Sequence, residues 1–304
     1  MRRLRALIAT VAPTRLSVLI EGATGTGKEL VAAAIHRQSG RSGALVAFNV
    51  CALGESMFED ALFGHVKGAY TGAFNESLGF LREANGGTAF FDEISGLHLP
   101  LQAKLLRAIE TGVFRPIGAA RDVRSDFRTV AATNEGLREL AEQGRFRDDL
   151  RHRLSGVVLA VPRLDERVDD IPLLVAHFLR CAGRPGLHVT ATAMARIQET
   201  PWPGNVRELK QAIDVVSAFA GDAVDEHAVE LAFATRESSR PTGRALRSTG
   251  GDLAERRELV ELLETTAWDT ERAASLLGIH RATIYRRMKR HGIEGRARSR
   301  EFAK

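Results

Sequence analysis

Short apolar runs alternate with helical patterns of apolar positions from the N-terminus to residue 160. Apolar residues spaced three and four apart predict helices over 28–38 and 101–110. Strands that alternate with helices in this way are typical of a parallel sheet with helices on both faces, so we predict an α/β fold. The predicted strands are Ser17–Glu21, Leu45–Phe48, Thr88–Phe91, Arg128–Ala132 and Val157–Val161.

The strand patterns end after Pro162, and helical periodicity continues from 169 to 232. A stretch rich in Ser, Thr, Gly and Arg follows, which is typical of a flexible linker, and a compact helical unit comes last. We therefore predict four parts. They are an α/β domain over 1–166, a small helical domain over 167–235, a linker over 236–252 and a C-terminal helical unit over 253–304.

The composition is ordinary for a globular protein, with 44% hydrophobic and 27% charged residues among 304. Only Cys51 and Cys181 occur, which gives no disulfide framework and favours a reducing cytoplasm. No run approaches the roughly 18 apolar residues of a membrane helix, so no membrane partner is expected.

The net charge of +5 is unevenly distributed. From Thr270 to the end there are 10 Lys or Arg against 3 Asp or Glu, a net charge of +7, whereas the rest of the chain has a net charge of −2. The excess positive charge favours contact of the C-terminal unit with phosphate groups. A solvated basic terminus is the alternative.

A glycine-rich sequence between the first predicted strand and helix has the spacing of a phosphate-binding loop. Backbone N–H groups of such a loop donate to phosphate oxygens, and its lysine reaches the β- and γ-phosphates. Glu29 stands where a Ser or Thr usually binds magnesium. A chance Gly-rich turn is the alternative. The loop consists of Gly22, Ala23, Thr24, Gly25, Thr26, Gly27 and Lys28.

Two carboxylates end the apolar run Ala89–Phe91, which is the pattern of a Walker B strand. Asp92 is placed to hold Mg²⁺, directly or through water. Glu93 is placed to orient and polarise the water that attacks the phosphate. An Asp-Glu pair is as often a helix N-cap as a site. Downstream of a phosphate-binding loop, however, it favours hydrolysis of ATP with Mg²⁺.

A loop of small residues with a single aromatic lies between the two halves of this predicted site. Glycines at both ends allow it to stand up as a mobile hairpin tip. With the preceding Leu62–His65 it resembles the GAFTGA loop of bacterial enhancer-binding proteins, AAA+ ATPases that activate sigma-54 RNA polymerase. Tyr70 replaces the more common Phe of that family, and an ordinary turn is the alternative. The loop consists of Gly68, Ala69, Tyr70, Thr71, Gly72 and Ala73.

The resemblance implies roles for further residues. Asn49 corresponds to the residue that holds the catalytic Glu back, and Thr133 with Asn134 looks like sensor I, which contacts the γ-phosphate. Trp202–Leu209 is similar to the sensor II motif of the lid domain, with Arg207 as the phosphate contact. The helical domain over 167–235 is then the lid.

The segment Gly144–Leu154 is similar to the one that carries the arginine fingers of the family. On that match Arg147 and Arg153 reach the γ-phosphate of the neighbouring subunit, which implies a homo-oligomer, in this family a hexameric ring. Taken singly, each arginine is more often a solvated surface charge.

The C-terminal unit has the pattern of a helix-turn-helix. Thr270–Ile279 predicts a helix ended by Gly, and His280–His291 predicts the next one. The unit resembles the Fis-type DNA-binding domain, and a three-helix protein–protein module is the alternative. The predicted small core is Ala274, Leu277, Ile279, Ile284 and Met288. The candidate contacts to double-stranded DNA are Arg281, Thr283, Tyr285, Arg286, Arg287, Lys289 and Arg290.

The chain is therefore identified as a member of the sigma-54 activator family, without an N-terminal regulatory domain. The resemblance implies a cytoplasmic ring ATPase that binds an upstream activator site and remodels sigma-54 RNA polymerase holoenzyme from closed to open complex. A DNA-binding, repressor-like relative with an uncoupled ATPase domain is the alternative. In the family, the segment before the phosphate-binding loop helps to enclose the adenine, so this pocket is either trimmed or the sequence begins inside a longer one.

Overall fold

The computed structural model describes residues 1–52, 54–239, 259–260, 262–266, 268–276, 284, 288 and 293. The chain divides into two compact units, Met1–Ser238 and Ser239–Lys304. Among the described residues, no helix has both the length and the apolar character that crossing a membrane requires.

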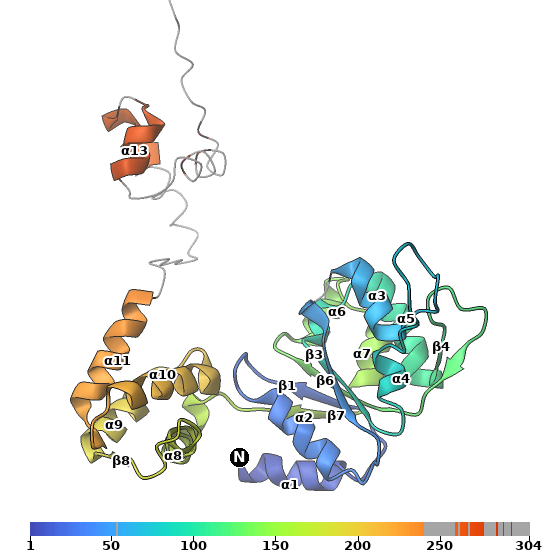
Figure 1. Ribbon diagram of the computed structural model, residues 1–304, viewed down its shortest axis with the longest axis horizontal. Coiled ribbons are helices and arrows are strands. Elements are labelled where there is room, and N and C mark those ends of the chain that lie inside the picture. Colours follow the sequence, from blue (N-terminus) through green and yellow to red (C-terminus); the bar gives the residue numbers. More distant parts are fainter. Residues whose placement is uncertain are drawn as a thin grey trace, which may run out of the picture. The chain divides into compact units, whose positions relative to one another are not determined.

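A five-stranded parallel sheet lies at the centre of the first unit (Figure 1). Its strands lie in the order β2-β3-β6-β1-β7, and each neighbouring pair is parallel. The predicted strands differ from the observed ones by at most one residue at either end, and the predicted α/β fold is confirmed. The strands are β1 (Val18–Glu21), β2 (Leu45–Asn49), β3 (Thr88–Asp92), β6 (Arg128–Thr133) and β7 (Val157–Ala160).

Helices cover both faces of the sheet because successive strand side chains point to opposite faces. On β3, Phe90 packs against the helices of one face and Phe91 against those of the other, and both rings are buried. One face is covered by α1 (Arg2–Val11) and α2 (Lys28–Arg37). The other is covered by α3 (Glu55–Phe63), α4 (Phe80–Glu83), α5 (Leu99–Thr111), α6 (Leu137–Glu142) and α7 (Asp148–Leu154).

Short elements connect these helices and strands. An antiparallel hairpin follows α5 and consists of β4 (Val113–Phe114) and β5 (Val123–Arg124). Two 3₁₀ turns lie at the carboxyl edge of the sheet, η1 (Val50–Ala52) after β2 and η2 (Ile94–Gly96) after β3. The carboxyl edge is where ligands bind in open α/β sheets.

A helical subdomain with its own core completes the first unit. Leu164, Trp202, Leu209 and Ile213 are buried in that core. The elements are η3 (Asp165–Asp170), α8 (Ile171–Cys181), β8 (His188–Val189), α9 (Ala191–Glu199), α10 (Asn205–Phe219), β9 (Ala223–Val224) and α11 (Glu226–Ser239).

The described part of the second unit contains α13 (Thr270–Leu276). A small apolar cluster includes Leu263, Ala273, Ile284 and Met288. Ile284 and Met288 were predicted to be core residues, and both are buried. The side chains at the other three predicted core positions, and all seven candidate DNA contacts, lie outside the described residues.

Candidate functional site

The phosphate-binding loop joins the end of β1 to the start of α2. Gly25 has a φ of +79° and Gly27 a φ of +98°, which only glycine adopts readily. A Cβ atom on Gly25 would lie 2.2 Å from the carbonyl oxygen of Gly204. The close approach of the Gly204 backbone therefore requires a glycine at position 25. The first N–H groups of α2, which lack intrahelical acceptors, are available to an anion.

Lys28 lies at the floor of this loop and is only 8% exposed. Its Nζ donates to the carbonyl oxygen of Gly22 at 2.9 Å and to that of Ala23 at 3.4 Å. Burial lowers the pKa of Lys28, while Asp92 and Glu93 oppose that shift. The loop thus holds a cation among backbone donors, which is the combination that phosphate oxygens require.

Two carboxylates lie at the end of β3, near Lys28. Asp92 pairs in register with Asn49 of β2, and its Oδ1 accepts from the backbone N–H of Glu93 at 3.1 Å. Burial raises the pKa of Asp92 and Lys28 lowers it.

Glu93 has a left-handed backbone with a φ of +56°. For a residue other than glycine this conformation costs roughly 1–2 kcal/mol. The fully buried Ile94 and a hydrogen bond from Gly96 N to the carbonyl oxygen of Glu93, 3.0 Å long, hold it in place. Strain of this kind clusters at functional sites.

Asn49 lies beside Asp92, but its side chain is engaged in another contact. Asn49 Oδ1 accepts from the backbone N–H of Cys51 at 2.9 Å. The thiol of Cys51 donates to the carbonyl oxygen of Glu93 at 3.9 Å, and burial raises the pKa of that thiol. Restraint of the Glu93 carboxylate by Asn49 stays a prediction.

The residues that look like sensor I lie against the phosphate-binding loop. Thr133 ends β6, the strand next to β1, and its carbonyl oxygen accepts from Gly22 N at 3.2 Å. Asn134 Nδ2 donates to the hydroxyl of Thr24 at 3.3 Å. The sheet order therefore brings both residues to the nucleotide site.

The helical subdomain contacts the same loop through three residues. Arg207 N donates to the carbonyl oxygen of Gly25 at 3.2 Å. Asn205, which is 2% exposed, donates from Nδ2 to the carbonyl oxygen of Thr24 at 3.0 Å. Arg167 Nη2 donates to the carbonyl oxygen of Thr26 at 2.9 Å. Asn205 and Arg167 were not predicted as site residues, and a polar residue beside the sensor II arginine was the available signal for Asn205.

We expect Asn205→Ala to lower the free energy of unfolding by about 1–3 kcal/mol. The Oδ1 of Asn205 also accepts from Leu164 N at 2.9 Å, so the alanine leaves buried polar groups unpaired on both sides. Urea denaturation of the two proteins measures the difference. Asn205→Gly is the matched control, because it loses the same bonds but relaxes the φ of +53°, and should be destabilised less. An unchanged midpoint for Asn205→Ala would contradict this role.

Two cavities adjoin at the loop and share Gly27, Leu30 and Val206 as walls. One, of about 460 Å³, is lined by the phosphate-binding loop, Asp92, Glu93 and Arg207. The other, of about 350 Å³, is largely apolar, and α1 contributes Leu4 and Ile8 to it. The segment before the phosphate-binding loop therefore forms part of the wall.

Arg147 and Arg153 line neither of these cavities. Arg147 precedes α7 and pairs with Asp149, with an Nη2–Oδ2 distance of 2.8 Å. Arg153 Nη2 donates to the carbonyl oxygen of Ile109 at 3.4 Å. Both side chains are exposed, so their cations are accessible at the surface of the subunit.

The loop Gly68–Ala73 forms a short hairpin. Gly68 N donates to the carbonyl oxygen of Ala73 at 2.9 Å, and Ala73 N to that of Tyr70 at 3.0 Å. Gly68 and Gly72 have left-handed φ values of +81° and +106°, as the tight tip requires. Tyr70 and Thr71 are exposed at the tip.

The hairpin after α5 supports the base of this loop. Ile117 N donates to the carbonyl oxygen of Gly64 at 2.8 Å, and Val66 N to that of Ile117 at 3.1 Å. A Cβ atom on Gly118 would lie 2.8 Å from the Cβ of Ala69. The loop and the segment between β4 and β5 are thus in direct contact.

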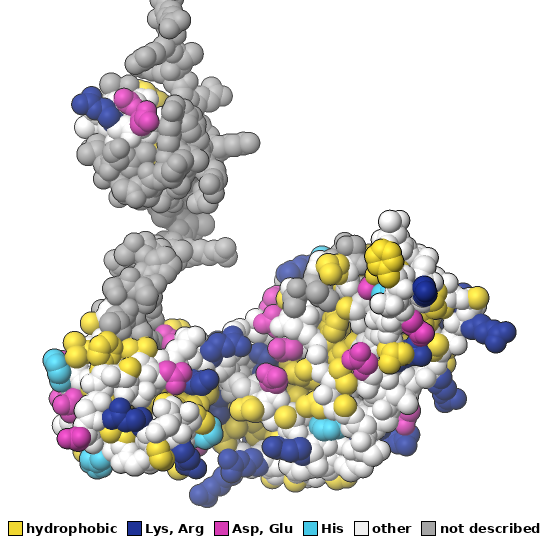
Figure 2. All heavy atoms as spheres, in the orientation of Figure 1, with side chains coloured by type: hydrophobic (Ala, Val, Ile, Leu, Met, Phe, Trp, Pro, Cys, Tyr) yellow, Lys and Arg dark blue, Asp and Glu magenta, His cyan; other side chains and the backbone are white. Residues whose placement is uncertain are grey.

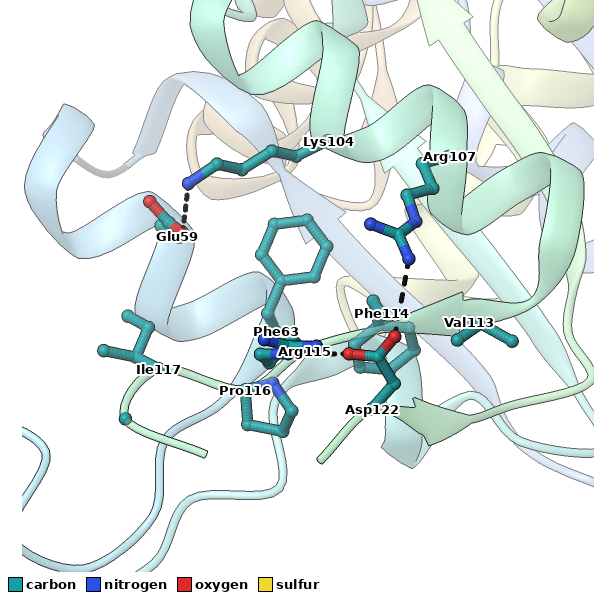
Figure 3. Close-up of a pocket in the computed structure, with 11 residues that line it drawn as sticks. Glu59, Phe63, Lys104, Arg107, Val113, Phe114, Arg115, Pro116, Ile117 and Asp122 are labelled. Carbon is teal, nitrogen blue, oxygen red and sulfur yellow. Dashed lines mark hydrogen bonds and ion pairs between the residues drawn. The ribbon is translucent and has the colours of Figure 1, made fainter. Parts of the chain in front are cut away.

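A cavity of about 460 Å³ lies between α3, α5 and that hairpin (Figure 3). The rings of Phe63 and Phe114 lie 5.7 Å apart at its wall. Ion pairs join the elements, Lys104 to Glu59 and both Arg107 and Arg115 to Asp122. Because α3 leads into the loop, these contacts tie the loop to α5.

Comparison with known protein families agrees with this geometry. Residues 1–160 match the model of the sigma-54 interaction domain. The chain belongs to the sigma-54 interaction family of AAA+ ATPases. Residues 165–246 match the AAA+ ATPase lid domain, and residues 252–291 match the Fis family of bacterial regulatory proteins. This is the domain composition of a sigma-54-dependent transcriptional activator with an AAA+ ATPase and a Fis-type DNA-binding domain.

Individual relatives are similar along nearly the whole chain. The chain is 43% identical to the anaerobic nitric oxide reductase transcription regulator NorR of Klebsiella pneumoniae (strain 342), over 97% of this chain and 61% of that protein. It is 39% identical to the transcriptional regulatory protein GlrR of Escherichia coli (strain K12), over 97% and 67%.

A crystal structure of NtrX from Brucella abortus in complex with ADP is similar with a TM-score of 0.68 and 30% identity, over 96% of this chain and 67% of that one. A second NtrX structure, in complex with ATP, has a TM-score of 0.67. The chain therefore spans 61% of the length of NorR and about two thirds of the length of GlrR and NtrX.

Proposed function

We propose that this chain hydrolyses ATP and uses the loop Gly68–Ala73 to convert sigma-54 RNA polymerase holoenzyme from the closed to the open promoter complex. One observation carries the proposal. The domain with Lys28, Asp92 and Glu93 at its sheet edge also presents an exposed Tyr70–Thr71 tip. An uncoupled ATPase would have no need of such a tip.

The two adjoining cavities fit the two ends of ATP. The triphosphate would lie against Lys28 and the N-terminus of α2, and the adenine in the apolar cavity whose wall includes α1. The Nε of Arg167, buried there without a hydrogen-bond partner, supports a polar ligand at that cavity. Thr133, Asn134 and Arg207 would contact the phosphates.

Asp92 would hold Mg²⁺ together with phosphate oxygens and water, as is usual for this ion. Mg²⁺ would neutralise the charge that develops on the phosphates. Glu29 has no hydroxyl group to bind Mg²⁺, so binding of the ion would depend more on Asp92. Glu93 would orient and polarise the attacking water, and Asn49 would restrain Glu93 between cycles.

Ring assembly would complete the site. Arg147 and Arg153 are exposed and lie outside the two cavities at the phosphate-binding loop of their own subunit, which supports a role for both in the neighbouring one. There they would spread the charge of the transferring phosphoryl group. We therefore propose a homo-oligomer, a hexameric ring as implied by the family.

The C-terminal unit would bind double-stranded DNA at an upstream activator site. The net charge of +7 over residues 270–304 would supply non-specific affinity for phosphate, and the helix predicted from His280 would supply sequence preference. Because polymerase and promoter DNA lie in the cytoplasm, the proposed activity would take place there.

Open-complex formation tests the proposal. The purified chain is incubated with sigma-54 holoenzyme and a supercoiled template that carries a sigma-54 promoter, and melted DNA is detected by permanganate footprinting. We expect melting with ATP, none with a non-hydrolysable analogue, and none when the same core polymerase carries a different sigma factor. Hydrolysis of ATP without melting would contradict the proposal and favour the repressor-like alternative.

A further inference from the structure

Tyr70, at the tip of the proposed docking loop, is turned toward its own domain. Its hydroxyl donates to Oδ2 of Asp60 at 3.3 Å, and its ring meets the His65 ring edge-on with 5.1 Å between centroids. A phenylalanine, the more common residue of the family at this position, has no hydroxyl to make the first contact. Tyr70 therefore has an anchor that the common residue lacks.

Asp60 is itself held in place by His65. Its Oδ1 lies 2.5 Å from Nδ1 of His65, which leaves Oδ2 for the tyrosine. The other ring nitrogen of His65, Nε2, lies 2.9 Å from the carbonyl oxygen of Asn75, on the far side of the loop. The imidazole thus links α3, which carries Asp60, to the segment that leaves the loop.

A neighbouring aromatic side chain without a polar group is more exposed to solvent than Tyr70. Phe74 directly follows the loop and is 79% exposed, whereas Tyr70 is 47% exposed. Figure 2 shows hydrophobic side chains exposed at this end of the ATPase domain. The contacts with Asp60 and His65 cover part of the Tyr70 side chain.

We propose that Asp60, oriented by His65, is a latch that holds Tyr70 against the ATPase domain until the loop docks. The inference rests on the proposed function of the loop. For the ring of Tyr70 to bury itself in the sigma factor, it must leave Asp60 and His65. A contact that exists only in the undocked state opposes docking, so its loss shifts the population toward the docked state.

Binding of isolated sigma-54 to the chain tests the latch. The chain is trapped with a transition-state analogue of ATP, and the dissociation constant is measured by fluorescence anisotropy. We expect Asp60→Ala to tighten binding by about two- to fivefold, the range of one exposed hydrogen bond. Asp60→Asn keeps an acceptor and should stay close to the unaltered chain. Tyr70→Phe should also tighten binding, and the double variant should fall short of the sum of the two, since both remove the hydrogen bond between the Tyr70 hydroxyl and Asp60.

A spectroscopic measurement tests the contact without sigma-54. The chain has two tyrosines, Tyr70 and Tyr285, so Tyr285→Phe leaves Tyr70 as the single ultraviolet-titrating phenol. Desolvation and the Asp60 carboxylate raise the pKa of Tyr70. We expect Asp60→Ala to lower that pKa toward its ordinary value.

Each result is decisive. Unchanged or weaker binding by both Asp60→Ala and Tyr70→Phe would overturn the latch, as would an additive double variant or a Tyr70 titration that Asp60→Ala leaves unchanged. If the unaltered chain fails to bind sigma-54 under any nucleotide condition, the proposed function is wrong. In that case, a Tyr70 pKa that responds to Asp60→Ala shows that the contact between Tyr70 and Asp60 nevertheless exists.

Discussion

Glu93→Gln is expected to leave ATP binding intact and to slow hydrolysis by at least roughly 100-fold. The amide has the shape of the carboxylate but cannot polarise the attacking water. Lys28, the proposed phosphate-binding residue, is untouched, so a fluorescent ATP analogue should bind with unchanged affinity. Phosphate release measures the turnover. Lys28→Ala is the contrasting variant, because loss of the buried cation should abolish binding itself.

Mixing two inactive variants tests whether the Glu93→Gln chain still folds and assembles with other subunits. It still carries Arg147, whereas an Arg147→Ala chain still carries Glu93. If the arginine acts across a subunit boundary, mixed rings contain complete sites, and the mixture should hydrolyse more ATP than the sum of its parts. Normal turnover by Glu93→Gln would refute the assignment of Glu93, and a mixture that equals the sum would refute the role of Arg147.

Thr71→Ala is expected to abolish open-complex formation while ATP hydrolysis stays largely intact. Thr71 does not line the cavity that contains Lys28 and Glu93, so the substitution removes a proposed docking group and no proposed catalytic one. Permanganate footprinting and phosphate release on the same preparation separate the two effects.

Thr71→Ser is the matched control for the tip. It keeps the hydroxyl and loses only a methyl group, so it should retain more open-complex formation than Thr71→Ala. An unchanged yield of open complex with Thr71→Ala would show that the loop does not couple hydrolysis to the polymerase.

The central sheet was predictable because its signal is local. Each strand is a short apolar run, and polar residues such as Asn49 and Asp92 mark the positions where strands end. Parallel pairing then aligns those ends, which is why Asn49 and Asp92 are partners in register. Motif spacing likewise predicted Lys28 and Glu93 as site residues without any knowledge of tertiary structure.

Contacts between distant segments were not predictable in this way. Asn205 and Thr24 are 181 residues apart in the chain, and no periodicity of the sequence predicts that they are hydrogen-bonded. Tyr70 was predicted as an exposed aromatic tip, but its anchor at Asp60 depends on how the loop folds back on α3. Both are hydrogen bonds whose partners become neighbours only after the chain has packed.

Gly118 has no side chain, and a Cβ atom at that position would lie 2.8 Å from the Cβ of Ala69. The segment between β4 and β5 can therefore lie directly against the loop Gly68–Ala73. Two backbone hydrogen bonds join Ile117 of that segment to Gly64 and Val66 at the base of the loop. A displacement of the hairpin after α5 is therefore expected to move the base of the loop with it.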